Sequence, residues 1–91
     1  MSDKEMVDVA KAMTKIEQEQ IFDTFNKNAE YFSANNKHHS KYISKLFEYF
    51  NNNFVLLQKF EEEDKNCEEC VAMIIKFWST VIYDIWQKEI V

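Results

Sequence analysis

The sequence contains no glycine and no proline, and this feature limits the folds that are open to it. Tight turns between strands usually need glycine, asparagine or aspartate, whereas glycine and proline both destabilise the interior of an α-helix. The sequence therefore predicts an all-α protein. The missing glycine also excludes phosphate-binding and dinucleotide-binding loops and the usual calcium-binding loop, because each of these requires glycine at a fixed position.

Length and charge narrow the possible functions. We expect the 91 residues to form a single helical domain, residues 1–91, which is too small to enclose a large catalytic cavity. The net charge is -5, and all 11 basic residues are lysines. Because arginine supplies the bidentate contacts that dominate the recognition of phosphates and bases, we expect no nucleic-acid partner.

Neither end of the chain has the pattern of a membrane or targeting segment. Residues 1–15 mix charged with small apolar residues, unlike a signal peptide. The longest apolar segment, residues 71–86, contains Lys76 and Asp84, and as a helix it would span only about 24 Å, against roughly 30 Å of bilayer hydrocarbon. We therefore expect no transmembrane segment and a cytoplasmic location.

Two capping-box spacings, Ser2 with Glu5 and Thr14 with Glu17, indicate the starts of two helices. The apolar residues near them fall on one helical face, and these are Met6, Val9, Ala10, Met13 and Ile16. We expect a short first helix that ends near Met13, with a second helix beginning at once. One continuous helix is the alternative.

From Phe22 onward, apolar residues recur with the four-three spacing of coiled coils. One set is Phe22, Ala29, Asn36, Ile43, Phe50 and Leu57, and the other is Phe25, Phe32, His39, Leu46, Asn53 and Phe60. Because the register continues through the polar residues 33–41, we expect one helix over residues 15–63. The alternative is a turn in residues 33–37, where asparagine tolerates left-handed geometry, and this would give a compact four-helix bundle.

Residues 61–66 form the clearest break, and we expect Asp64 or Asn66 to cap the helix that follows. Residues 67–90 carry an apolar stripe so wide that more than one side must be covered. We therefore predict a coiled-coil-like hairpin of long helices, in which residues 22–60 lie antiparallel to residues 67–90 and the first helix closes over one end. The predicted neighbours are Ile74 and Leu57, Val81 and Phe50, and Trp86 and Ile43.

Two pairs of residues have the spacing of a chemical site. Cys67 and Cys70 match a redox or metal half-site, and His38 and His39 could supply two further zinc ligands. In the predicted hairpin the histidines lie about 30 Å from the cysteines. The carboxylates around the cysteines also oppose a thiolate. We expect reduced, structural cysteines, no catalytic residue, no metal and no cofactor, and therefore no enzyme.

Residues 28–37 read Asn-Ala-Glu-Tyr-Phe-Ser-Ala-Asn-Asn-Lys, and further amides follow at residues 51–53. An asparagine, an acidic residue and then Ala-Asn-Asn inside a long helix resemble the middle of the phasin family over residues 25–63. Phasins are small helical proteins that coat polyhydroxyalkanoate granules in bacteria. The resemblance implies a non-enzymatic, self-associating, cytoplasmic helical protein.

Eight phenylalanines, four tyrosines and two tryptophans exceed what one small core requires. We expect the excess to form an apolar face that docks on an identical chain, a granule surface or a partner protein. The first functional hypothesis is a phasin-like protein that coats a hydrophobic surface, and the alternative is a small adaptor or inhibitor that binds a partner protein. We expect a homo-oligomer, most simply an antiparallel dimer. The residues expected at its interface are Phe22, Phe25, Phe32, Trp78 and Trp86.

Overall fold

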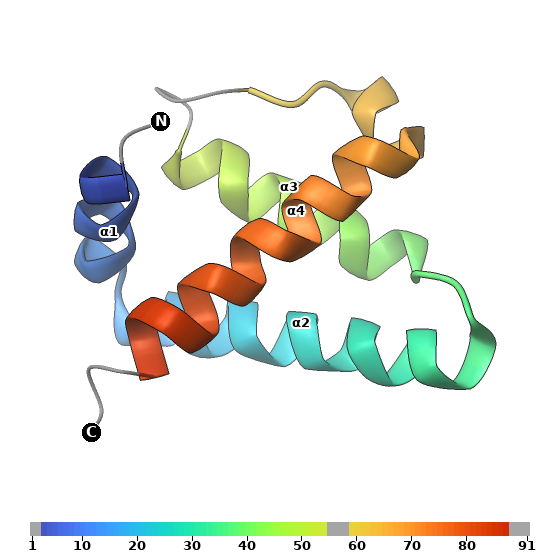
Figure 1. Cartoon of the computed structure of the whole chain (residues 1–91), viewed down its shortest axis with the longest axis horizontal. Helices are drawn as coiled ribbons and strands as arrows, with labels where there is room; N and C mark the ends of the chain where they lie inside the picture. Colours follow the sequence, from blue (N-terminus) through green and yellow to red (C-terminus); the bar gives the residue numbers. More distant parts are fainter. Residues whose placement is uncertain (1–2, 55–58, 88–91) are drawn as a thin grey trace.

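The computed structural model describes residues 3–54 and 59–87, and every regular element in these ranges is helical. The elements are α1 (Asp3–Ala12), α2 (Lys15–Asn35), α3 (Ser40–Asn53), the 3-10 helix η1 (Glu62–Asn66), α4 (Glu68–Thr80) and the π-helical turn η2 (Val81–Trp86), which continues α4 (Figure 1). The prediction of an all-α protein is confirmed. The fold is the compact four-helix arrangement that the sequence offered as the alternative.

The predicted break between the first two helices is confirmed. Helix α1 ends at Ala12, and Thr14 caps α2 with its hydroxyl, which accepts a hydrogen bond from the backbone N–H of Glu17 at 3.1 Å. The side chain of Gln18 donates to the carbonyl of Met13 at 3.0 Å and so satisfies a backbone group in the connection. Ser2, which was expected to cap α1, lies outside the described residues.

The prediction of one helix over residues 15–63 is wrong. Helix α2 ends at Asn35, and Asn36 adopts the left-handed conformation with φ 57° and ψ 31°. Its backbone N–H still donates to the carbonyl of Phe32 at 2.8 Å, as in a helix that closes on a left-handed residue. Asparagine adopts this left-handed geometry more readily than most other residues that carry a side chain, so the turn does not require glycine. The chain therefore reverses here, and α3 returns along α2 (Figure 1).

The predicted antiparallel hairpin is also wrong. Helices α3 and α4 cross each other, and both run from right to left in Figure 1. Across this crossing, the indole N–H of Trp78 donates to the carbonyl of Leu46 at 3.0 Å. The indole N–H of Trp86, for which the hairpin predicted Ile43 as the neighbour, donates to the carbonyl of Ala10 in α1, also at 3.0 Å. The expected register, including Val81 near Phe50, does not apply, and Leu57 lies outside the described residues.

The break before α4 is longer than predicted. Helix α3 ends at Asn53, and η1 occupies residues 62–66. Neither Asp64 nor Asn66 caps α4, because Cys67 takes that position. Asp64 instead completes a capping box with Glu61 at the start of η1.

The core lies between α2, α3 and the α4–η2 helix, and α1 adds Ala10 to it. Its largest fully buried side chains come from α2, α3, the α4–η2 helix and Phe54 directly after α3. Rings in contact meet mostly edge to face, with centroids 4.8–5.9 Å apart around Phe54, Phe77 and Trp78. The π-helical turn widens the apolar face, since four of its six residues are buried. The buried apolar residues are Ala10, Met13, Ile21, Ile43, Leu46, Phe47, Phe50, Phe54, Phe60, Ile74, Trp78, Val81, Ile82, Ile85 and Trp86.

Candidate functional site

The five aromatic residues expected at an interface separate into two groups. Trp78 is completely buried, and Trp86 is only 6% exposed, so both belong to the core. Phe22 and Phe32 remain 38% and 40% exposed, and Phe25 is partly buried against the core. The candidate interaction surface is therefore on α2 and not on the tryptophans.

Phe22, Phe25, Ala29 and Phe32 follow one another with a three-four-three spacing, which places them along one side of α2. We call this set the α2 stripe. The adjacent side of α2 faces the core through Ile21, Thr24 and Asn28. At its middle, the stripe meets the last helix, because the rings of Phe25 and Tyr83 are 6.3 Å apart and nearly perpendicular, at 74°. The stripe thus lies at the edge of the core, with its two ends open to solvent.

A groove adjoins each end of the α2 stripe. The larger one, of about 630 Å³, contains Phe32 and runs between the start of α3, η1 and the start of α4. Its lining residues are Phe32, Asn36, Lys37, His38, Ser40, Ile43, Ser44, Glu62, Lys65, Asn66, Glu68, Val71 and Ala72. The smaller groove, of about 270 Å³, contains Phe22 and is lined by Lys15, Gln18, Glu19, Ile82, Trp86 and Gln87. Both grooves combine an apolar floor with charged rims.

A polar cluster at the α2–α3 connection positions the Phe32 end of the stripe. Asn28 is 2% exposed, and its carbonyl oxygen accepts from the backbone N–H of His39 at 2.9 Å while its Nδ2 lies 2.9 Å from Nδ1 of His38. The imidazole of His38 in turn packs on the ring of Phe32, with centroids 4.6 Å apart. His39 caps α3 through Nδ1, which accepts from the backbone N–H of Lys41 at 3.1 Å. The histidines are therefore turn-forming residues.

Asn28 was not among the predicted site residues. It lies outside both sets of the four-three pattern, so the spacing gives no signal for it. The buried amide is satisfied by His38 and by the backbone N–H of His39.

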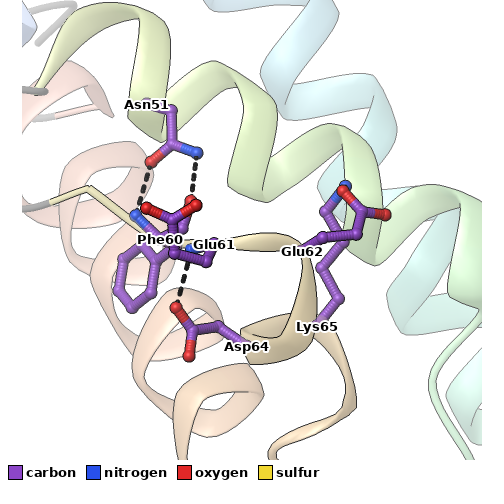
Figure 2. A network of polar contacts seen from close by, with 6 residues as sticks. All are labelled: Asn51, Phe60, Glu61, Glu62, Asp64 and Lys65. Carbon is purple, nitrogen blue, oxygen red and sulfur yellow. Dashed lines mark hydrogen bonds and ion pairs between the residues drawn. The ribbon is translucent and has the colours of Figure 1, made fainter.

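A second polar network holds the segment before α4 against α3. The side-chain amide of Asn51 binds both backbone groups of Phe60, donating to its carbonyl and accepting from its N–H, each at 2.9 Å (Figure 2). The backbone N–H of Glu61 then donates to Asp64 at 2.7 Å, and Lys65 pairs with Glu62 at 3.0 Å. The side-chain amide of Asn51 thus satisfies both backbone groups of Phe60, while the ring of Phe60 packs in the core.

Cys67 and Cys70 lie at the start of α4, directly after this network, and both are free and half-buried. The backbone N–H of Cys70 donates to Sγ of Cys67 at 3.3 Å. A hydrogen bond to the Cys67 side chain, with partial burial and the negative charge of Cys67, Asp64 and Glu69, raises the pKa of Cys70 to about 11. His38 lines the same groove as Asn66 and Glu68, the residues on either side of Cys67.

Among residues 3–54 and 59–87, no three or more His, Cys, Asp or Glu side chains are grouped so that they could hold a metal ion. Within the same ranges, no helix combines the length and the apolar character needed to cross a bilayer. Comparison with family models, curated proteins and solved structures gives no significant match.

Proposed function

We propose that this protein is a non-enzymatic interaction protein that self-associates through the α2 stripe. The observation that carries the proposal is the exposure of Phe22 and Phe32, at 38% and 40%, on a chain in which every other phenylalanine and both tryptophans are buried or partly buried. Exposed aromatic residues next to grooves with charged rims are typical of protein–protein contacts. Aromatic side chains are also the usual anchors of such interfaces.

A second copy of the chain suits this stripe because its spacing is self-complementary. If two α2 helices pack antiparallel about a two-fold axis, Phe22 of each copy lies opposite Phe32 of the other. Phe25 then lies opposite Ala29, whose small side chain allows the helices to approach closely. A two-fold interface uses the same patch on both chains, as this pairing requires.

The charges beside the stripe favour the same arrangement. Glu19 lines the groove next to Phe22, and Lys37 lines the groove next to Phe32. Antiparallel packing brings Glu19 of each copy toward Lys37 of the other, whereas parallel packing would place like charges together. Such rim charges contribute more to orientation than to affinity.

Sedimentation equilibrium tests the proposal. We expect the wild-type chain of 11.0 kDa to sediment as a dimer at micromolar concentration, and the double variant Phe22→Ser and Phe32→Ser to sediment as a monomer. Ile16→Ser is the matched control, because Ile16 is also on α2, is 70% exposed and lies outside the stripe. A wild-type chain that remains monomeric up to about 100 μM would contradict self-association, because its dimer would then dissociate far more readily than specific dimers do.

A phasin-like role on a hydrophobic surface is the second candidate. It is supported by two further exposed apolar side chains on the α4–η2 helix, Met73 at 52% and Tyr83 at 42%. Together with Phe22 and Phe32, they could contact a hydrophobic inclusion. Cell fractionation separates the two roles: enrichment with inclusions that is lost in the double variant supports surface coating, whereas a soluble protein that is absent from the inclusions supports self-association alone.

A further inference from the structure

Cys67 and Cys70 occupy different electrostatic environments although they are only three residues apart. Cys67 caps α4, with φ -89° and ψ 116°, and its Sγ accepts the backbone N–H of Cys70 at 3.3 Å. A helix of 13 residues follows. The partial positive charge at a helix start and an N–H aimed at the sulfur both stabilise a thiolate. Cys67 therefore differs from Cys70 in that its sulfur accepts a backbone N–H at the start of the helix.

Cys70 is held in its protonated form. Its Sγ lies 3.9 Å from Oδ1 of Asp64, and the hydrogen bond to Cys67, together with burial and neighbouring charges, raises its pKa to about 11. Two of the carboxylates that oppose a thiolate at this site, Asp64 and Glu69, thus act on Cys70. The side chains of Cys67 and Cys70 interact directly at the first turn of α4, so the two sulfurs lie next to each other.

We propose that Cys67 and Cys70 form a reversible disulfide by thiol–disulfide exchange, with Cys67 as the attacking residue and Cys70 as the resolving residue. The thiolate of Cys67 attacks one sulfur of a low-molecular-weight disulfide, a mixed disulfide forms, and one thiol leaves. Cys70 then loses its proton to Asp64 or to water and attacks Sγ of Cys67, and the second thiol leaves. Two protein thiols are oxidised, and one external disulfide is reduced to two thiols.

The surrounding charge points to the class of disulfide. Glutamates at positions 61, 62, 63, 68 and 69 flank the pair and are exposed, and Lys65 is the one basic residue in the segment 61–70. A negative surface potential lowers the local concentration of anionic reactants and raises that of cationic ones. A cationic or neutral disulfide is therefore the preferred oxidant. This proposal does not depend on self-association through the α2 stripe.

The first experiment measures which cysteine reacts. The reduced wild-type protein is treated with substoichiometric iodoacetamide at about pH 7.5, and the labelled residue is identified by tandem mass spectrometry. We expect Cys67 to react at least about tenfold faster than Cys70, because only the thiolate is nucleophilic. In urea, the preference should disappear, since it depends on the cap. Equal labelling of the folded protein would overturn the assignment.

The second experiment follows oxidation in a redox buffer. With cystamine, a cationic disulfide, the mass of the wild type should fall by two hydrogen atoms and no adduct should remain. The Cys70→Ser variant should instead retain a mixed disulfide on Cys67. Oxidised glutathione, which is anionic, should react several-fold more slowly, and Glu68→Gln with Glu69→Gln should reduce that difference. Circular dichroism confirms that each variant is folded. A wild type that accumulates only mixed disulfide, or remains a dithiol after Cys70→Ser has formed an adduct, would overturn the proposal.

Discussion

Nδ2 of Asn28 lies 2.9 Å from Nδ1 of His38, while Oδ1 of the same amide accepts from the backbone N–H of His39 at 2.9 Å. One buried side chain from the middle of α2 thus satisfies two groups of the connection to α3. Both histidine rings accept at Nδ1, His38 from Asn28 and His39 from the backbone of Lys41. These contacts determine where α2 ends and which way α3 leaves.

The first prediction concerns this amide. We expect Asn28→Ala to lower the free energy of unfolding by about 1–3 kcal/mol, because it leaves the N–H of His39 unsatisfied in a partly buried site. His38→Phe should cost less, since it retains the ring against Phe32 and removes only one of the two hydrogen bonds. Urea unfolding followed by circular dichroism measures both. Equal costs for the two variants would show that the backbone contact has little weight.

The second prediction tests the turn itself. Asn36 has φ 57°, a conformation that glycine adopts freely and that other residues adopt at a cost of about 1 kcal/mol or more. We expect Asn36→Gly to be neutral or stabilising and Asn36→Ala to be destabilising by about that amount. A continuous helix over residues 15–63 requires the opposite order, because alanine is the best helix former and glycine one of the poorest. Thermal unfolding of the two variants therefore distinguishes the two structures by sign.

The third prediction tests whether Trp78 belongs to the core or to the interaction surface. Trp78→Phe removes a buried hydrogen bond to Leu46 and part of the ring, so we expect a loss of about 1–3 kcal/mol of stability. The sedimentation mass should not change, because Trp78 is completely buried. Tyr83→Phe, at a ring that is 42% exposed, is the control and should alter stability little. If Trp78→Phe changed the sedimentation mass without lowering the stability, Trp78 would have to lie at the interface and not in the core.

The fourth prediction is the pH dependence of Cys70. Because its pKa is raised to about 11, the folded chain holds this proton more tightly than the unfolded chain. The resulting contribution to stability is present below the ordinary value for cysteine and is lost as the pH rises toward 11. Labelling of Cys70 should accordingly remain slow through pH 9. Asp64→Asn should shift the onset of labelling to lower pH, because it removes a negative charge and can still accept from Glu61.

Local features of the fold could be predicted from the sequence, and long-range ones could not. The start of α2 depends on Thr14 and Glu17, which are three residues apart, because the backbone N–H of Glu17 donates to the hydroxyl of Thr14. The turn at Asn36 was obscured because the four-three spacing continues through it, and His39 occupies a core position of that pattern while acting as the cap of α3. Spacing alone does not report the left-handed geometry of one asparagine.

The direction of α4 relative to α3 depends on contacts between distant residues. The bond from Trp78 to Leu46 spans 32 positions and that from Trp86 to Ala10 spans 76, and neither has a sequence signal. For the same reason, the tryptophans could not be distinguished from Phe22 and Phe32 as interface residues. All four are large aromatic side chains at helical spacing, and only the packing of α1 and α3 around α4 decides which are covered.

The most direct test of the central claim is a photo-cross-link from the α2 stripe. The protein is prepared with p-benzoylphenylalanine in place of Phe32, mixed with an isotopically labelled copy, irradiated and mapped by mass spectrometry. Antiparallel pairing predicts links between copies that end near Phe22 of the labelled chain, and none from a probe at Ala34, which is exposed on another side of α2. Links confined to a single chain, or equal yields from positions 32 and 34, would contradict the account.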